Sequence, residues 1–217
     1  SIPDIVIGRL PIYLRALNRL ASEGHEITSS HELGQRLGIS SAQIRKDLSH
    51  FGGFGKQGTG YQIEYLQEKL RKVLNIDREW EVALIGMGDL GKAIANYRGF
   101  SDRGFHIACL FDSAPDKIGQ TIGEFTVRPI SELKESIEAQ HIRLAMVAVP
   151  AEYAQGVADI LVDAGVKGIL NFAPTVLKLP AGVQLVTVDF TIQLEQLAFR
   201  VQLGDGDSRL SDAYPVV

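Results

Sequence analysis

The chain has 217 residues, enough for one large or two small domains, and its 45% hydrophobic content is ordinary for a packed globular protein. No apolar run approaches the length of a membrane span, and Arg9 and Pro11 interrupt the short apolar start, so we expect neither membrane insertion nor a signal peptide. The single cysteine, Cys109, excludes disulfides and cysteine-rich metal sites, and it is expected to be a buried thiol in a cytoplasmic protein.

The net charge of −4 hides an asymmetry. Residues 1–78 hold 11 Lys and Arg against 8 Asp and Glu, so the excess of acid lies in residues 79–217. A basic segment followed by an acidic one predicts two domains with different partners. The basic N-terminal domain is a candidate for binding nucleic acid.

The N-terminal segment has the pattern of a helix-turn-helix. Pro11 occupies the favoured first position of a helix that Gly24 ends. A second helix follows with Ser29 or Ser30 as its N-cap, and after a turn at Gly38 a third helix begins. Two short helices joined by a glycine-containing turn define this motif.

The third helix, expected over residues 42–51 with Ser40 or Ser41 as N-cap, predicts a DNA contact. Its inward side consists of Ile44, Leu48 and Phe51. Its outward side carries Arg45 and Lys46, which suit guanine edges and phosphates. The further candidates for DNA contact here are Ser41, Gln43 and His50. The alternative is a plain packing module in which the two basic side chains are only solvated.

Five glycines surround Lys56 between residues 51 and 61. This composition predicts a tight β-hairpin wing whose backbone can approach a phosphate chain, with Lys56 and Gly58 as DNA contacts. A connecting helix is then expected over residues 61–74, with one apolar face formed by Ile63, Leu66, Leu70 and Val73. Residues 75–78 are the expected domain boundary.

Residues 82–85 form a continuous apolar run, typical of a strand buried on both faces, and the run ends in Gly86-x-Gly88-x-x-Gly91. Gly86 permits the tight turn, Gly88 lets the backbone approach a pyrophosphate, and Gly91 lets the next helix pack on the strand. The helix expected over residues 92–97 would direct its amide dipoles at the anion. The predicted cofactor contacts in this stretch are Gly86, Met87, Gly88, Asp89, Leu90 and Gly91.

The strand expected over residues 106–111 ends in Asp112, which lies 21 residues after Gly91. An acid there can accept hydrogen bonds from the adenosine ribose hydroxyls and repels a 2′-phosphate, so the pattern predicts NAD in preference to NADP. Lys117 is the one nearby feature that could weaken this preference.

The remaining chain alternates strand and helix, with strands expected over residues 124–128, 144–149, 168–172 and 183–188. A helix capped by Ser131 and another over residues 151–164 lie between them. Six strands in this order predict an α/β fold with a Rossmann-type doubly wound parallel sheet. Cofactors bind at the carboxyl ends of such strands, so Val149, Pro150, Phe172, Ala173 and Asp189 are expected near the nicotinamide half.

After Asp189 only a helix over residues 191–201 and a polar tail are expected, and no second domain holds a substrate. No catalytic group and no metal-ligand spacing is apparent. The apolar stripe of the last helix, Leu194, Leu197, Ala198 and Val201, packs either on its own domain or on a partner subunit. The tail from residue 203 is expected to be mobile.

Five segments together resemble the Rex family of redox-sensing transcriptional repressors: SAQIRKDLSHFG (41–52), GKQGTGY (55–61), LIGMGDLG (84–91), FD (111–112) and AGVKGILNFAP (164–174). The resemblance implies a homodimer that exchanges its C-terminal helix, binds operator DNA and responds to the NADH/NAD⁺ balance, with NADH causing release. It implies an N-terminal winged helix-turn-helix domain over residues 1–78, an NAD(H)-binding Rossmann domain over 79–190, and a dimerisation helix with its tail over 191–217. It assigns DNA contacts to Arg45, Lys46 and Lys56.

The resemblance and one local feature lead to a hypothesis for the redox switch. Asp189 would lie near the nicotinamide ring, which is positive in NAD⁺ and neutral in NADH, so its carboxylate would respond to the redox state. Tyr97 and Arg15 are the candidate alternative partners. The alternative is that Asp189 only caps the last helix.

Two other classes of function stay open. An NAD-dependent oxidoreductase fused to a DNA-binding domain would need a catalytic base, which the sequence does not offer. A CoA-binding module is possible because CoA ligases share this kind of sheet and an Ala-Gly-Val-Lys-Gly-Ile segment, although Asp112 argues against it.

Overall fold

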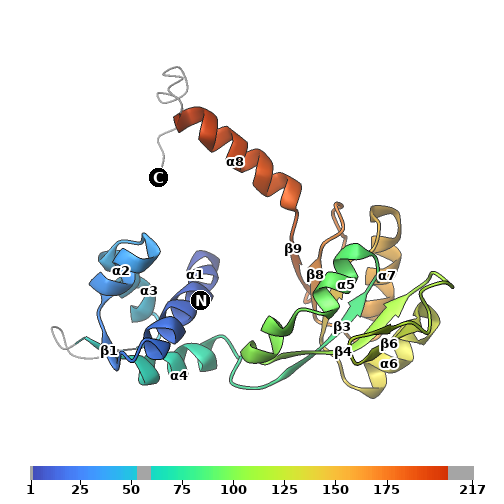
Figure 1. The fold of residues 1–217 in the computed structure, drawn as a ribbon, viewed down its shortest axis with the longest axis horizontal. Helices are drawn as coiled ribbons and strands as arrows, with labels where there is room; N and C mark the ends of the chain where they lie inside the picture. The colour runs from blue at the N-terminus through green and yellow to red at the C-terminus, as the bar shows by residue number, and fades with distance from the viewer. Residues whose placement is uncertain (1, 53–59, 205–217) are drawn as a thin grey trace. The chain divides into compact units, whose positions relative to one another are not determined.

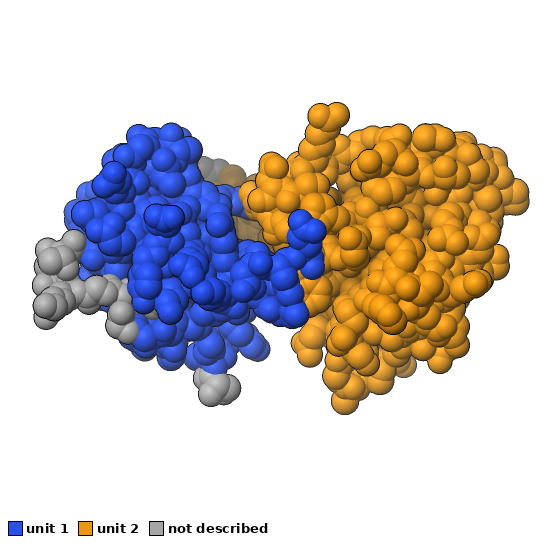
Figure 2. Space-filling model, turned by 90° about the horizontal axis from the view of Figure 1, so that it is seen from below, with its two compact units in different colours: residues 1–79 blue, residues 80–217 orange. Residues whose placement is uncertain are grey.

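The computed structural model describes residues 2–52 and 60–204, and the chain forms two compact units, Ser1–Glu79 and Trp80–Val217 (Figures 1 and 2). Each unit has its own hydrophobic core. None of the described helices is long and apolar enough to cross a membrane.

The first unit is helical. Its elements are α1 (Asp4–Ser22), β1 (Ile27–Thr28), α2 (Ser30–Leu37), α3 (Ser41–Ser49), β2 (Tyr61–Gln62) and α4 (Ile63–Val73). All four helices contribute to one core, whose fully buried side chains include Leu10, Leu17, Leu33, Ile44, Ile63 and Leu70. The two short strands pair antiparallel, Ile27 with Gln62 and Thr28 with Tyr61, and so connect the entry to α2 with the entry to α4.

Three boundary predictions in this unit are wrong. The first helix begins at Asp4 rather than at Pro11, because Val6 and Leu10 are buried and their packing offsets the hydrogen bond that an internal proline removes. The third helix ends at Ser49, and α4 begins at Ile63 because Tyr61 pairs in the small sheet. Val73, expected on the buried face of α4, is 38% exposed.

The second unit is built on a sheet of seven strands in the order β5-β6-β4-β3-β7-β8-β9. The strands are β3 (Trp80–Ile85), β4 (Phe105–Asp112), β5 (Thr121–Ile122), β6 (Phe125–Pro129), β7 (Leu144–Val147), β8 (Gly168–Asn171) and β9 (Gln184–Thr187). All neighbours run parallel except the β5–β6 pair. Apart from the short β5 at the edge, this is the strand order of a doubly wound Rossmann sheet, which confirms the predicted fold class.

Helices cover both faces of the sheet. Successive side chains of β3 point to opposite faces, and those of residues 82–85 are buried on each of them. Ala83 and Ile85 pack with α6 (Leu133–Ala139) and α7 (Ala151–Asp163), whereas Val82 and Leu84 pack with α5 (Asp89–Ala95) on the other face. A parallel strand covered on both faces consists of consecutive apolar residues, and for this reason β3 could be predicted from the sequence.

Cys109 is buried in β4, as expected. Burial raises the pKa of its thiol to about 11, so the thiol stays protonated at neutral pH and does not act as a nucleophile.

The second unit differs from the prediction in its number of strands, in the role of Ser131 and in the bounds of α5. The sequence predicted six strands, and the seventh, β5, is a two-residue strand that turns back on β6 through Gly123. Ser131 does not cap a helix, because it lies in a 3₁₀ turn (Ile130–Glu132) that precedes α6. Helix α5 begins at Asp89 and ends at Ala95, so Tyr97 lies outside it.

The last described helix, α8 (Phe190–Gly204), starts directly after β9 and is longer than expected. Its apolar side chains are unusually exposed: Phe190, Ile192, Leu194, Leu197, Phe199 and Val201 each have 45–64% of their surface accessible. Asp189 accepts hydrogen bonds from the amides of Thr191 at 2.9 Å and Ile192 at 3.3 Å, so its carboxylate caps this helix. The tail after Gly204, for which mobility was expected, lies outside the described residues.

Candidate DNA-binding surface and dinucleotide pocket

The helix-turn-helix of the first unit is capped by serines at both helix starts. Ser29 accepts a hydrogen bond from the amide of Glu32 at 3.0 Å, and Ser40 accepts one from Gln43 at 3.2 Å. Gly38 ends α2 in the left-handed conformation, with φ of +67°, which turns the chain toward α3. These caps fix where α3 begins and therefore which side chains it presents.

Arg45 and Lys46 are exposed on α3, as predicted, together with His50 at its C-cap. The Arg45 guanidinium donates to the hydroxyl of Ser30 at 3.0 Å, so the side chain reaches the first residue of α2. Ser41 is half-buried at the start of the helix. Lys56 and Gly58, and most of the predicted wing, lie outside the described residues.

A buried carboxylate on α3 was missing from the prediction. Both oxygens of Asp47 accept hydrogen bonds from the Arg9 guanidinium of α1, from Nε at 2.6 Å and from Nη2 at 2.8 Å. The Tyr13 hydroxyl donates to it at 2.6 Å, and so does the Gln43 side-chain amide, also at 2.6 Å. Gln43, a predicted DNA contact, therefore has its amide nitrogen engaged within the unit.

These contacts control the charge of Asp47. Burial acts to raise its pKa, but the hydrogen bonds from Arg9, Tyr13 and Gln43 outweigh burial, so the pKa lies below its ordinary value. The side chain is an ionised carboxylate that joins α3 to α1.

In the second unit, the glycine-rich turn links the end of β3 to α5. Gly86 has φ of +98°, and an added Cβ would overlap the carbonyl oxygen of Ala148. A Cβ on Gly91 would overlap the carbonyl oxygen of Gly86, so α5 and the end of β3 approach as closely as backbone allows. Around Gly88, by contrast, an added Cβ would meet no atom within 4 Å. The turn therefore has two packing glycines and one that faces open space.

Asp112 ends β4 beside this turn and is buried. Its Oδ2 accepts a hydrogen bond from the Met87 amide at 2.7 Å and contacts the Lys117 ammonium at 3.3 Å, and its Oδ1 accepts from the Ala114 amide at 2.8 Å. Burial acts to raise the pKa of Asp112, yet these donors outweigh it and hold the pKa below its ordinary value.

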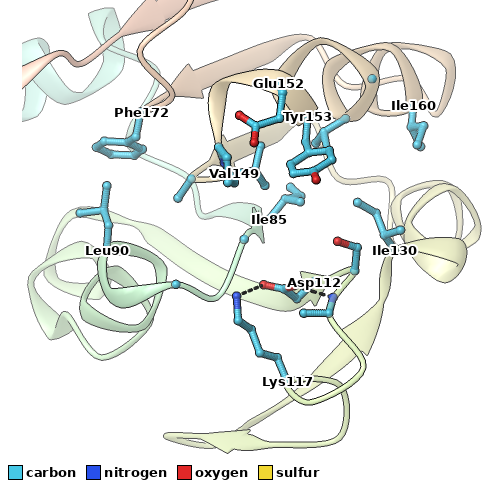
Figure 3. A pocket seen from close by; sticks show the side chains of 18 of the residues that line it. Ile85, Leu90, Asp112, Lys117, Ile130, Val149, Glu152, Tyr153, Ile160 and Phe172 are labelled. Atoms are coloured by element: carbon cyan, nitrogen blue, oxygen red, sulfur yellow. Dashed lines mark hydrogen bonds and ion pairs between the residues drawn. The ribbon is translucent and has the colours of Figure 1, made fainter.

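A pocket of about 820 Å³ opens at the carboxyl ends of β3, β4 and β7, the place where doubly wound sheets bind ligands. In Figure 3, Leu90 and Phe172 lie at one end, and Ile130 and Ile160 lie at the other. Asp112 and Lys117 line one side, while Glu152 and Tyr153 of α7 line the opposite side. The size suits a dinucleotide or a comparable nucleotide ligand.

The pocket brings together most of the predicted cofactor residues: Gly86, Gly88, Asp89, Leu90, Asp112, Lys117, Val149 and Pro150. Met87 and Gly91 are not in its lining, because the side chain of Met87 is fully buried and Gly91 faces the β3 turn. Asp189 is also absent from the lining. The switch candidates Tyr97 and Arg15 are both exposed, and Tyr97 packs edge-on against Phe100.

The prediction missed the α7 side of the pocket, formed by Glu152, Tyr153, Gly156, Val157 and Ile160, and also Ile130. The sequence did contain the information needed to predict that α7 lines the pocket. The helix begins directly after Pro150 at the end of β7, and its first turns must therefore flank the ligand edge of the sheet.

Fold and site together define a class of protein: a helix-turn-helix unit followed by a Rossmann unit with a nucleotide-sized pocket. Two family models agree with this division. The model described as "Putative DNA-binding protein N-terminus" matches residues 1–49, and the CoA binding domain model matches residues 77–175.

Relatives identify the family. Redox-sensing transcriptional repressor Rex of Roseiflexus sp. (strain RS-1) is 51% identical over 91% of this chain and 90% of its own length. The Rex repressor of Streptomyces coelicolor is 42% identical over 98% of this chain and 82% of its own length. The chain belongs to the Rex family of redox-sensing transcriptional repressors.

Solved structures of one Rex-family repressor, RSP, have the same fold. RSP in complex with β-NAD⁺ and operator DNA is 37% identical with a TM-score of 0.91, covering 98% of each chain. RSP in complex with β-NADH is 36% identical with a TM-score of 0.85, covering 94% of this chain and 96% of RSP.

Proposed function

We propose that this chain is a transcriptional repressor that binds operator DNA as a homodimer and senses the NADH/NAD⁺ ratio, with NADH causing release from DNA. The observation that carries the proposal is the presence on one chain of an exposed basic recognition helix and a Rossmann pocket with an acid at the end of its second strand. A relative with the same fold over 98% of the chain binds both β-NAD⁺ and operator DNA.

On the DNA side, Arg45 and Lys46 of α3 contact the operator, with Arg45 reading a guanine edge or a phosphate. Ser41, Gln43, His50, Lys56 and Gly58 are the further proposed contacts. Ser30 holds the Arg45 side chain at 3.0 Å before DNA arrives, which lowers the entropy cost of binding.

On the cofactor side, the glycine turn approaches the pyrophosphate at Gly88, where the space is open. Asp112 and Lys117 lie at the adenosine ribose, and Val149 and Pro150 lie toward the nicotinamide. When bound, the cofactor supplies a ring whose charge differs between its two oxidation states. Asp189 is the proposed sensor of that charge, with Tyr97 and Arg15 as its candidate partners, and its capping of α8 connects this position to the helix proposed for dimerisation.

The proposal is tested by titrating the protein onto the operator DNA of RSP at one fixed salt concentration, with NAD⁺ and separately with NADH. We expect tight binding with NAD⁺ and release with NADH. Arg45→Ala should lose about 1–3 kcal/mol of operator binding, whereas Arg71→Ala, the same change on the exposed side of α4, should lose little. Equal operator affinity with both cofactors would refute the redox response.

The homodimer is proposed to form through α8, whose six large apolar side chains over residues 190–201 would otherwise face water. Replacing both Leu194 and Leu197 with Asp should give monomers that bind DNA poorly, because a dimer presents two recognition helices to a two-fold operator. Sedimentation measures the change. The control replaces Gln196 with Asp on another side of the same helix and should stay dimeric, and a dimeric Leu194/Leu197 variant would rule out this interface.

One observation favours a second ligand class. The family model that matches residues 77–175 is described as a CoA binding domain. CoA therefore belongs in the same titration as the dinucleotides. The close relatives are repressors and not enzymes, so an oxidoreductase is not proposed.

A further inference from the structure

Gln43 lies in the first turn of α3, the part of a recognition helix whose side chains contact base edges in the major groove. Its backbone amide donates to the hydroxyl of the N-cap residue Ser40 at 3.2 Å, and its side chain is half-buried. The side-chain amide nitrogen donates to Oδ1 of Asp47, four residues later on the same helix, at 2.6 Å. The chain therefore holds both the backbone and the head group of Gln43 in place.

All acceptor sites of the Asp47 carboxylate are occupied. A carboxylate has about four such sites, and Arg9 fills two of them, whereas Tyr13 and Gln43 fill one each. Burial acts to raise the pKa of Asp47, but these hydrogen bonds outweigh burial and hold the pKa below its ordinary value. The group is an ionised carboxylate, which accepts hydrogen bonds and donates none, so its partner on Gln43 must be the amide nitrogen.

A reversed Gln43 amide would place two acceptors against each other. The carbonyl oxygen Oε1 would take the place of the nitrogen, 2.6 Å from Oδ1 of Asp47, where two negative atoms repel. The observed orientation leaves one N–H and Oε1 of the amide for other partners. Among residues 2–52 and 60–204, none donates a hydrogen bond to Oε1.

The two orientations of this amide suit different bases. Adenine presents the N7 acceptor and the N6 amino donor in the major groove, and a glutamine that offers one N–H and one carbonyl oxygen pairs with both. Guanine presents two acceptors, N7 and O6, so an amide whose nitrogen faced outward would suit it better. The orientation that Asp47 enforces therefore favours adenine.

We propose that Gln43 reads an adenine in each operator half-site through paired hydrogen bonds, and that Asp47 is the positioning residue that orients the amide for adenine and against guanine. The inference rests on the proposed operator binding and assigns a base specificity to it. Arg9 and Tyr13 of α1 contribute at one remove, because they hold the carboxylate ionised and in place. Base selection is thus shared between α3 and a helix that precedes the helix-turn-helix.

The test compares the operator DNA of RSP with variants in which each adenine in turn is replaced by guanine, with its partner changed to cytosine. Affinities are measured at one fixed salt concentration with NAD⁺ present. At one position in each half-site, the replacement should weaken binding of the unaltered protein by about tenfold or more. Gln43→Ala should remove most of this penalty at that position alone, and Gln35→Ala, which changes an exposed glutamine of α2, should leave every penalty unaltered.

Two further measurements separate reading from positioning. 7-Deazaadenine at the same position lacks the N7 acceptor but still pairs with thymine, so it should weaken binding by the unaltered protein and not by Gln43→Ala. Asp47→Asn offers Gln43 both a donor and an acceptor, so the amide can take either orientation and the ratio of the guanine to the adenine dissociation constant should fall severalfold. Each ratio is taken within one protein, so a general loss of affinity does not change it.

Each outcome decides one claim. If no penalty depends on Gln43, if the position that depends on Gln43 prefers guanine, or if a folded Asp47→Asn keeps the full ratio, the proposal is overturned while operator binding through Arg45 stands. If Asp47→Asn does not fold, the unaltered protein decides, because an amide free to turn would tolerate guanine where adenine is read. Failure of the unaltered protein to bind the operator at all would instead refute the repressor function.

Discussion

Asp47→Ala should destabilise the first unit by about 3 kcal/mol and abolish tight operator binding. Removing one partner of a buried ion pair costs about 3–5 kcal/mol, and the lower end applies because a fifth of the Arg9 side chain is exposed. The variant leaves the Arg9 guanidinium and the Tyr13 hydroxyl without the acceptor that both now share. The tie between α1 and the proposed recognition helix is lost with it.

Denaturant unfolding followed by circular dichroism measures the loss, with Glu68→Ala as the control. Glu68 pairs with Lys72 on the surface of α4, where solvent screens an ion pair and leaves it little effect on stability. Similar losses in the two variants would show that Asp47 has no special role.

Acid sensitivity gives a second measurement of the same group. The pKa of Asp47 is lowered in the folded state, so its contribution is full above the unfolded value of about 4 and is lost as the pH falls through the folded pKa. The unaltered protein should therefore lose stability below about pH 4 more steeply than Asp47→Ala. Parallel pH profiles would contradict this assignment.

The sequence predicted well those parts of the molecule whose structure depends on residues close together in the chain. The apolar run before the glycine turn, the turn itself and the acid at Asp112 are all adjacent or regularly spaced, and their positions in the sheet follow from backbone geometry. Serine caps placed α2 and α3 within one residue for the same reason.

The parts that were missed depend on contacts between distant segments. Asp47 lies three residues after Ile44, beside the inward side of α3, and its carboxylate is buried there because Arg9 and Tyr13, 38 and 34 residues earlier, donate hydrogen bonds to it. Helix α1 continues through Pro11 because residues before it pack in a core formed by three other helices. The contacts of Asp112 also depend on the folded chain, since the sequence places Lys117 nearby but does not show that its ammonium and the Met87 amide both contact the carboxylate.

Gly91→Ala should lower both stability and NADH binding, whereas Gly88→Ala should lower NADH binding alone, although both replace a glycine of the same turn. A Cβ on Gly91 overlaps the carbonyl oxygen of Gly86, and neither backbone can yield without separating α5 from β3. Overpacking of this kind costs about 1–3 kcal/mol, so Gly91→Ala should lower the stability of the second unit and weaken NADH binding together. A Cβ on Gly88 meets no protein atom, and its φ of −74° suits any residue.

Gly88→Ala should therefore unfold like the unaltered protein, within about 0.5 kcal/mol, and lose cofactor affinity only because the added methyl occupies the space where the pyrophosphate approaches the backbone. The measurements are thermal unfolding without cofactor and NADH titration of each variant, with Gly8→Ala as the control for binding, since a Cβ there also meets no protein atom and Gly8 does not line the pocket. If Gly88→Ala binds NADH normally, the pyrophosphate does not lie against this turn. If Gly91→Ala is as stable as the unaltered protein, the close approach of α5 to β3 is not needed for the fold.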